Sequence, residues 1–526
     1  MGIRTIIPGP PGTGKTHRLV NHYLEKEIKE LKTDPKKIVY LTFGKAGIDE
    51  AEARIQHSLL YVSTLHALGT RECKIDTNKQ LLNGKQKWKL FRNYPGHELW
   101  QNMSFESTVD SAGNPIYEND HMRIIAYARA KKISLSEAAV QLDKHASTDL
   151  YLTEQLIQDL KTFKKETKMV EFSDMIKLFV TKDKMNDPAS PISDIEAVFL
   201  DEAQDLSPAQ WDMFFYIERH CKRSYLAGDD DQTIYTFQGA DPDIFINLEK
   251  QNLPEGWKAV KDNQIESHRV PRKIHAKALE VLSRIDNRFL KTWEPRNAEG
   301  EVFENYYLND INFVEGNWMI LAQTNDLLSE IGEHFYGLGI RYSGKANKYL
   351  PNKTLEAYRI WTRLHQGAVV SSEEAKIVYD EVLSFRAKHT AFRYSSGKTL
   401  DKVEFVNLED LKKDHGLLVT GSWEQLHIDE DVKDYMKRLL DNGDTLMKDS
   451  RIKLFTLHGS KGRECTNVVL FLDYGTAMQI KPYREACRNP DAQHRLVFVG
   501  ITRAKQRLYI MAPLYDNYYT IGHPIT

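Results

Sequence analysis

The sequence predicts an α/β protein built on parallel β-sheet, and two widely separated runs of residues carry this prediction. An apolar, strand-like stretch at residues 3–7 leads into the run GPPGTGKT at residues 9–16, and a helical pattern follows over residues 17–31. This order of strand, loop and helix is the context in which G-x-x-x-x-G-K-[ST] forms a phosphate-binding loop. The second run, LDEAQD at residues 200–205, ends the apolar stretch that begins at Ala197. A parallel sheet presents side chains to its ligand at that end of a strand.

The first run has the composition of a triphosphate-binding loop. Glycines allow successive backbone N–H groups to turn toward phosphate oxygens, and the start of the following helix adds a positive dipole end. Lys15 supplies a point charge, and Thr16 supplies a hydroxyl ligand for Mg²⁺. The residues expected to hold the triphosphate are Gly9, Pro10, Pro11, Gly12, Thr13, Gly14, Lys15 and Thr16.

The second run places two carboxylates next to each other at the end of a strand. Asp201 is expected to hold Mg²⁺ through water, so Thr16 and Asp201 form the expected metal site. Glu202 is placed to orient and deprotonate the attacking water, because phosphoryl transfer depends on positioning and charge neutralisation. Lys15, Asp201 and Glu202 are therefore the first expected catalytic residues.

Length and composition narrow the class of protein. A chain of 526 residues is too long for one core, and 41% hydrophobic with 28% charged residues is typical of globular domains. No apolar run reaches the roughly 18 residues of a membrane span, and the start lacks a signal-peptide layout, so we expect a cytoplasmic protein without a membrane partner. The four cysteines lack paired spacing, which indicates neither disulfides nor a metal site. A net charge of -2 means that any bound polyanion must follow a local track.

Further motifs follow in order along the chain. They are LAGDDDQ at 226–232, TIYTFQGA at 233–240, SHR at 267–269, TLHGSKGRE at 456–464 and VFVGITRA at 497–504. Together with the first two runs, this set resembles the superfamily 1 DNA helicases of the UvrD/Rep/PcrA type. The resemblance implies two RecA-like P-loop motor domains with parallel sheets, each carrying an inserted, mainly helical or mixed subdomain. It also implies ATP and Mg²⁺ between the motors and 3′ to 5′ movement on single-stranded DNA.

The resemblance assigns roles to residues within these motifs. Gln232 matches the family's γ-phosphate sensor, and Arg269 and Arg503 match its two arginine fingers. A finger stabilises charge on the transferring phosphoryl oxygens and, if the other domain donates it, acts only when the domains close. Gly462 and Glu464 are expected at the nucleotide, where Glu464 matches the acidic contact to the ribose.

Candidate contacts to the DNA strand are of two kinds. Phe43, Tyr235 and Phe237 could stack on bases without reading their sequence, although each could instead pack in a core. Polar or imidazole side chains in segments similar to the family's strand-contacting ones are Thr64, His66, Asn325 and His458.

The chain also departs from the family pattern. His17 and His268 stand where the family has an arginine and a tyrosine on the two faces of the base, and too few residues precede Gly9 for the family's base-reading glutamine segment. We therefore expect relaxed choice among nucleoside triphosphates, because stacking survives while edge-reading hydrogen bonds are missing. Gln238 and Gln323 stand where the family has arginines near the strand, so we expect a weaker grip and a shallower salt dependence.

The motifs also divide the chain. Residues 1–84 and 170–275 are predicted to form the first motor, with a helical insertion at 85–169. Residues 276–355 and 446–526 are predicted to form the second motor, with a reduced insertion at 356–445.

Three functional alternatives stay open. The chain could unwind DNA, or it could be a single-strand translocase that displaces proteins with little unwinding, or it could be an RNA-directed motor, because stacking does not distinguish the sugars. A nucleotide-switched binding protein is disfavoured because Glu202 and both fingers are present. The expected partners are single-stranded DNA and single/double-strand junctions, bound by a chain that is monomeric in isolation.

Overall fold

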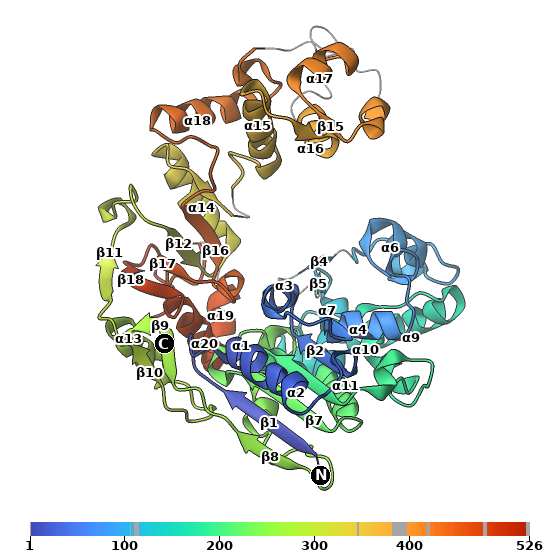
Figure 1. Ribbon diagram of the computed structural model, residues 1–526. Coiled ribbons are helices and arrows are strands. Elements are labelled where there is room, and N and C mark those ends of the chain that lie inside the picture. The colour runs from blue at the N-terminus through green and yellow to red at the C-terminus, as the bar shows by residue number, and fades with distance from the viewer. Residues whose placement is uncertain are drawn as a thin grey trace.

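The computed structural model describes residues 2–105, 107–109, 115–344, 347–380, 397–417, 421–476 and 481–521. Within these residues, two six-stranded parallel sheets each carry a smaller appended unit (Figure 1). This arrangement confirms the predicted α/β class with two RecA-like motor domains.

The first sheet has the strand order β3-β2-β6-β7-β1-β8, and all its strands are parallel. Every residue of β2 and β6 is buried, because helices cover both faces of the sheet. The strands are β1 (Ile3–Pro8), β2 (Ile38–Thr42), β3 (Tyr61–Thr64), β6 (Ala197–Asp201), β7 (Arg223–Gly228) and β8 (Lys258–Lys261). The helices are α1 (Lys15–Arg18), the π-helical η1 (Leu19–Leu24), α2 (Glu25–Lys29), α3 (Lys45–Arg54), α4 (Leu65–Glu72), α10 (Phe172–Thr181), α11 (Pro208–Glu218) and α12 (Pro242–Ile246).

A mainly helical unit is inserted between β3 and β6 and has its own core. Aromatic side chains dominate this core, where Trp88 stacks on Phe105 with ring centroids 5.0 Å apart. Its elements are α5 (Thr77–Gln80), α6 (Gly84–Arg92), β4 (Ser107–Val109), β5 (Pro115–Tyr117), α7 (Asp120–Lys131), α8 (Leu135–Gln141) and α9 (Leu150–Thr167).

The second sheet has the order β11-β18-β17-β12-β16-β13 and is also fully parallel. Val270 and Ile274 already pack in its core, slightly before the predicted start of this motor at residue 276. The strands are β11 (Glu301–Tyr306), β12 (Trp318–Ala322), β13 (Tyr342–Ser343), β16 (Ile452–Thr456), β17 (Cys465–Leu470) and β18 (Ala504–Met511), with the separate pair β9 (Glu266–Pro271) and β10 (Glu294–Arg296). The helices are α13 (Arg272–Leu282), α14 (Asn325–Gly337), α19 (Lys481–Arg488) and α20 (Pro490–Ile501).

A second inserted unit, orange in Figure 1, lies beyond α14 and away from the first sheet. Its core forms around Trp361 and Tyr435. Its elements are α15 (Asn352–His365), β14 (Val370–Ser371), α16 (Ser372–Val378), β15 (Phe405–Val406), α17 (Leu408–Asp414) and α18 (Glu430–Asp441). No helix among the described residues is long and apolar enough to cross a bilayer.

The topology brings the motifs together at one edge of the first sheet. The phosphate loop follows β1, Asp201 ends β6, and Asp229 follows β7, and these three strands are neighbours in the sheet. The second motor packs against this edge, because Ile234 and Tyr235 belong to the same apolar cluster as Leu457 of the second motor.

Candidate active site and nucleic-acid interface

The phosphate loop leaves the carboxyl end of β1 and turns directly into α1. Gly12 and Gly14 both have a φ of 77°, a conformation that favours glycine. A side chain on Gly12 would meet Arg269 Cβ at 2.6 Å, so the loop is packed tightly against β9. Lys15 folds back over the loop, where its Nζ donates to the carbonyl of Gly9 at 2.7 Å. The loop therefore has the glycine geometry and the cation that a triphosphate requires.

The expected metal ligands contact each other. Thr16 Oγ1 donates to Asp201 Oδ2 at 2.6 Å, and the Tyr40 hydroxyl donates to the same oxygen at 3.1 Å. Burial and the neighbouring Glu202 carboxylate raise the pKa of Asp201 to about 6. A hydroxyl and a carboxylate oxygen in contact are suitable ligands for Mg²⁺, so the residues present fit that ion.

Glu202 adopts a strained backbone conformation. Its φ is 52°, in the left-handed region that a non-glycine residue rarely occupies, and such strain is common at functional sites. Gln204 Nε2 donates to Glu202 Oε2 at 2.6 Å and so fixes the carboxylate. Although burial works against the charge, Lys461 and Lys15 lower the pKa of Glu202. The carboxylate therefore stays ionised and can accept a proton from water.

Gln232, the expected γ-phosphate sensor, and Arg503, one of the two expected fingers, bond to each other across the two motors. Arg503 Nη2 donates to Gln232 Oε1 at 3.0 Å, and Gln232 Nε2 donates to Asp229 Oδ2 at 2.7 Å. Arg503 is 1% exposed, and its other bonds go to the carbonyls of Val499 and Arg463 and to the hydroxyl of Thr502. Burial and the nearby Arg269 lower the pKa of Arg503 to about 9. This buried guanidinium contacts no carboxylate among the described residues, so its environment favours an added anion.

Arg269, the other expected finger, and Glu464, the expected ribose contact, form an ion pair. Arg269 Nε donates to Glu464 Oε2 at 2.6 Å, and Lys505 Nζ donates to Glu464 Oε1 at 3.0 Å. Gly462, two residues earlier, has a φ of 75° and lets the chain turn before β17. Arg269 and Glu464 thus lie together beside the phosphate loop, with their side chains directed at each other.

The two histidines expected on the base lie close to the loop. A side-chain carbon on Gly14 would lie 3.9 Å from His17 Cβ and 3.9 Å from His268 Cδ2. The His268 N–H donates to the Gly12 carbonyl at 2.8 Å, which ties β9 to the loop. Both imidazoles are exposed, so a flat base could reach them.

An eight-residue segment at 457–464 crosses the second motor between two edges of its sheet. It begins at the carboxyl end of β16 with Leu457 and His458 and ends at the amino end of β17 with Glu464. Midway along it, Lys461 contacts Asp205 and donates to the Gln232 carbonyl at 2.8 Å. Burial raises the pKa of Asp205 to about 7, against the opposing effect of Lys461.

The aromatic candidates form one cluster at the junction of the motors. The Tyr235 ring centroid lies 5.0 Å from that of Phe43 and 6.2 Å from that of Phe237, and the Phe237 centroid lies 5.1 Å from that of His458. Phe237 is 45% exposed, whereas Tyr235 is 4% exposed and packs in the core between the motors. Only the outer part of this cluster is open to a base as the residues stand.

Thr64 and His66 lie elsewhere on the first motor, in a cavity of about 1090 Å³ between α3, α4 and α10. His66 stacks on Phe172 with centroids 4.1 Å apart, and burial lowers the pKa of His66 to about 3, so its ring is neutral. The cavity lining has more basic than acidic side chains: Lys45, Arg71, Lys74 and Lys87 against Asp49 and Glu52. Asn325, at the start of α14, is exposed and lies outside this cavity lining and the aromatic cluster.

Several residues that build the site were not predicted. Gln204 and Asp205 lie in the same motif as Glu202, and Lys461 lies in the same motif as His458 and Glu464, so their positions within these motifs could have suggested them. Tyr40 carried no such signal, because only the pairing of β2 with β6 brings it to Asp201.

The fold and the site define a P-loop nucleotide-dependent motor in which the second sheet completes the site of the first. Two family models match the sequence: the UvrD/REP helicase N-terminal domain over residues 2–252 and the UvrD-like helicase C-terminal domain over residues 421–514. The chain belongs to the UvrD/Rep helicase family.

Named relatives align over nearly the whole chain. ATP-dependent DNA helicase PcrA of Bacillus subtilis is 22% identical, with 95% of this chain and 79% of that protein covered. ATP-dependent DNA helicase Rep of Buchnera aphidicola is 21% identical, with coverage of 96% and 88%. The probable DNA helicase II homolog of Mycoplasma pneumoniae is 19% identical, with coverage of 97% and 82%.

Proposed function

We propose that this helicase hydrolyses Mg-ATP between its two motors and uses the cycle to move 3′ to 5′ along single-stranded DNA, opening duplex at single/double-strand junctions. The contact between Arg503 and Gln232 carries the nucleotide part, because it joins a buried cation of the second motor to the loop after β7, the strand next to the one that carries the phosphate loop. The DNA part rests on family membership and on the names of the relatives, and the polarity rests on the resemblance of the motifs.

Each residue has a defined task in hydrolysis. Lys15 and the loop N–H groups bind the β- and γ-phosphates, and Thr16 with Asp201 holds Mg²⁺, which neutralises phosphate charge when bound. Glu202 accepts a proton from the attacking water, since Lys461 and Lys15 keep it ionised. Arg503 stabilises the charge that spreads over the transferring oxygens.

The segment 457–464 offers a path between nucleotide and strand. Lys461 bonds to the sensor loop at the Gln232 carbonyl, while His458 lies in the aromatic cluster with Phe237. A shift of the second motor on nucleotide binding therefore moves both of these contacts together, which couples turnover to grip on the strand.

We further propose that the strand runs over the exposed part of the aromatic cluster, with the basic cavity around His66 as a second contact on the first motor. Stacking on Phe237 supports sequence-independent binding, and the lysines and arginine of the cavity support contacts to phosphates. The division into two motors and two insertions is part of this proposal, with boundaries that fall a few residues before some of the predicted ones.

A strand-displacement assay tests the proposal. The substrates are 3′-tailed DNA, 5′-tailed DNA and the matching RNA duplexes, with phosphate release measured in parallel. We expect ATP-dependent displacement of the 3′-tailed DNA alone. Phosphate release stimulated by single-stranded DNA without displacement would favour the translocase, and displacement of RNA alone would favour the RNA-directed motor.

Two variants separate binding from turnover in this assay. Lys15→Ala removes the cation on the phosphates, so nucleotide binding and hydrolysis should both be lost. Arg503→Ala should still bind nucleotide but fail to turn over. Equal loss of binding in both variants would contradict the finger role of Arg503.

Base choice is the remaining part of the proposal. His17 and His268 flank the loop at Gly14 and can stack on any base, so we expect hydrolysis of ATP, GTP, CTP and UTP with efficiencies within about tenfold of each other. A preference for ATP of about a hundredfold would defeat this expectation.

A further inference from the structure

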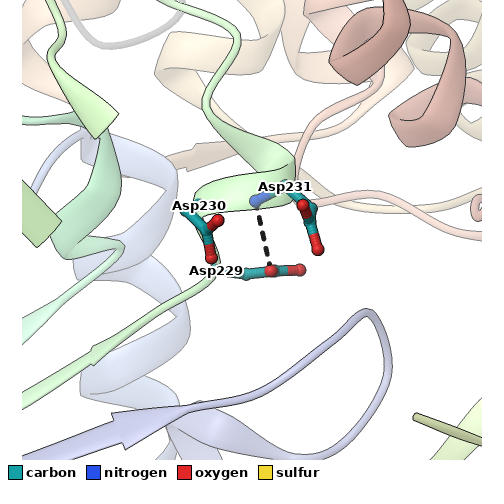
Figure 2. Close-up of side chains that lie close together, drawn as sticks. All are labelled: Asp229, Asp230 and Asp231. Atoms are coloured by element: carbon teal, nitrogen blue, oxygen red, sulfur yellow. Dashed lines mark hydrogen bonds between the residues drawn. The ribbon is translucent and has the colours of Figure 1, made fainter. Parts of the chain in front are cut away.

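Three carboxylates form one buried cluster directly after β7. The ligand oxygens of Asp229, Asp230 and Asp231 lie within 4.8 Å of one another (Figure 2). All three residues are at most 1% exposed. Carboxylates this close and this buried cannot all ionise unless cations compensate them.

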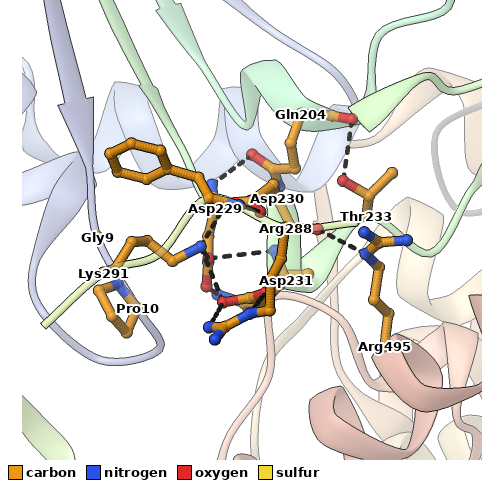
Figure 3. Close-up of polar contacts among 12 residues, drawn as sticks. Gly9, Pro10, Gln204, Asp229, Asp230, Asp231, Thr233, Arg288, Lys291 and Arg495 are labelled. Carbon is orange, nitrogen blue, oxygen red and sulfur yellow. Dashed lines mark hydrogen bonds and ion pairs between the residues drawn. The ribbon is translucent and has the colours of Figure 1, made fainter. Parts of the chain in front are cut away.

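Two cations from one segment provide that compensation (Figure 3). Lys291 Nζ lies 2.8 Å from Asp229 Oδ1 and 2.8 Å from Asp231 Oδ2, and it also contacts Asp230. Arg288 holds Asp231 through two parallel bonds of 2.8 and 2.6 Å. The Lys291 side chain is 4% exposed, and although burial works against its charge, the three carboxylates raise the pKa of Lys291. The cluster is therefore a closed ion-pair network with Lys291 in contact with all three acids.

The segment that carries these cations is anchored to the second motor. Trp293 packs in the second core, with its ring centroid 5.7 Å from that of Phe498 in α20. Asp491, also in α20, accepts the N–H groups of residues 286 and 287 at 3.1 Å each. Arg495 of α20 donates to the Asp230 carbonyl at 3.0 Å. Arg503 follows the other end of the same helix and bonds to Gln232. The helix and the residues just after it therefore contact the loop of residues 229–232, the acidic loop, at two points.

The acidic loop in turn holds the γ-phosphate sensor. One oxygen of Asp229 faces Lys291, and the other accepts from Gln232 Nε2 at 2.7 Å. Gln232 Oε1 then accepts from Arg503 Nη2 at 3.0 Å. A continuous series of contacts thus runs from Lys291 through Asp229 and Gln232 to the finger.

We propose that Lys291, assisted by Arg288, is a positioning residue for hydrolysis: it fixes the Asp229 carboxylate, which sets the Gln232 amide between the nucleotide and Arg503. The inference rests on the proposed function and assigns the segment 286–291 a role in it. Since Lys291 acts through Asp229, its loss should lower turnover and leave nucleotide affinity unchanged.

The test uses the full chain with Lys291→Met, which keeps the length of the side chain and removes its charge. The matched control is Lys277→Met, because Lys277 is 13% exposed and likewise bonds two carboxylates at 2.8 Å, those of Glu280 and Glu304. A double variant, Lys291→Met with Asp230→Asn, removes one buried acid along with the cation. The measurements are kcat and KM of hydrolysis stimulated by single-stranded DNA, the Kd of a fluorescent ADP probe, and Tm.

We expect kcat of Lys291→Met to fall at least about tenfold, with KM and the ADP Kd within about twofold of the unmodified chain and of Lys277→Met. The double variant should regain Tm without regaining kcat, because Asp229 still lacks the ammonium group. It also carries the test if the single variant does not fold.

A double variant that recovers both Tm and kcat would show a purely structural role and overturn the inference. So would a Lys291→Met chain whose kcat changes no more than that of the Lys277 control. An unmodified chain without any hydrolysis would overturn the proposed function itself, and this inference with it.

Discussion

Two arginines of this protein are equally inaccessible, yet they lie at opposite edges of the first sheet in opposite electrostatic surroundings. Arg4, in the amino-terminal half of β1, is 0% exposed and pairs with both carboxylate oxygens of Glu218. Its remaining donors reach the carbonyls of Leu248, Gln251 and Asn252. Every hydrogen-bond partner of this cation among the described residues is an acceptor, and one of them, Glu218, carries a full negative charge.

Arg503, which the second motor brings to the carboxyl edge, is 1% exposed, and its hydrogen-bond partners among the described residues are all neutral oxygens. A buried charge without a counter-charge costs several kcal/mol by order of magnitude, whereas a satisfied pair such as Arg4 and Glu218 comes near to balance. The amino edge of the first sheet thus holds a directly paired cation, whereas the second motor brings a cation without a directly contacting carboxylate to the edge where the phosphate loop emerges. This difference shows that the carboxyl edge is organised to receive an anion.

The largest effect should come from Arg503→Met, which removes the uncompensated charge. Phosphate release should fall about 10³-fold or more, because a finger arginine contributes that much to phosphoryl transfer. Nucleotide binding and Tm should stay near those of the unmodified chain, since no carboxylate loses its partner. Single-turnover phosphate release, a fluorescent ADP probe and thermal melting measure the three quantities. A large drop in Tm would make Arg503 a structural residue like Arg4 and remove the contrast.

Arg4→Met should have the opposite profile. It leaves Glu218 buried without its cation, so the free energy of unfolding should fall by about 3–5 kcal/mol, while the folded fraction hydrolyses ATP normally. Urea unfolding measures the loss. The double variant Arg4→Met with Glu218→Met should recover much of it, because both charges are gone. A single variant as stable as the unmodified chain would show that the pair contributes nothing.

This contrast also explains how far sequence reasoning reached. The phosphate loop, Asp201 and Glu202 were predictable because their chemistry is local: the strand, the turn and the ligand lie within one short run of residues. The order of the motifs then predicted that Arg503 belongs near Gln232, and the structure places them in contact.

What escaped prediction depends on contacts between distant segments. The periodicity of the sequence does not distinguish Tyr235, which is buried between the motors, from Phe237, which is exposed two residues later. The pairing of Arg269 with Glu464 joins residues 195 positions apart. Lys291 stands in a stretch without a motif, and only the packing of α20 against the acidic loop brings it to Asp229. Long-range packing leaves no local pattern in the sequence, so only the three-dimensional structure reveals these contacts.

The pH dependence of hydrolysis should report the charge of Asp201, which lies at the carboxyl edge of the first sheet. Burial and Glu202 raise the pKa of Asp201 to about 6, so the group loses its charge as the pH falls through that value. Because the pKa is raised in the folded state, the protonated form of Asp201 stabilises the fold, and this contribution is lost as the pH rises through about 6. The ionised form is the one that binds Mg²⁺. We expect kcat/KM to fall below about pH 6, by about tenfold per unit.

Magnesium provides the control for that assignment. Protons and Mg²⁺ compete for the Asp201 carboxylate, so raising the Mg²⁺ concentration about tenfold should move the acid limb to lower pH. A limb that stays in place would assign the titration to another group, such as Asp205, whose pKa of about 7 is raised by burial.

The smallest effect should come from the carboxyl edge of the second sheet. Gln323 follows β12, and its Nε2 is buried without a hydrogen-bond partner among the described residues, so this edge holds an unsatisfied hydrogen-bond donor. Gln323→Arg should add one cation beside the proposed strand, and each phosphate neutralised on a single strand steepens the plot of log Kobs against log salt by about 0.7. Binding of single-stranded DNA measured across a salt series gives the slope.

The control is Gln251→Arg, which places the same charge at the amino edge of the first sheet, where the Gln251 carbonyl accepts from Arg4. This variant should leave the slope unchanged. If both variants steepen it equally, the added charge acts through the general field of the protein, and the carboxyl edge of the second sheet has no special part in holding the strand.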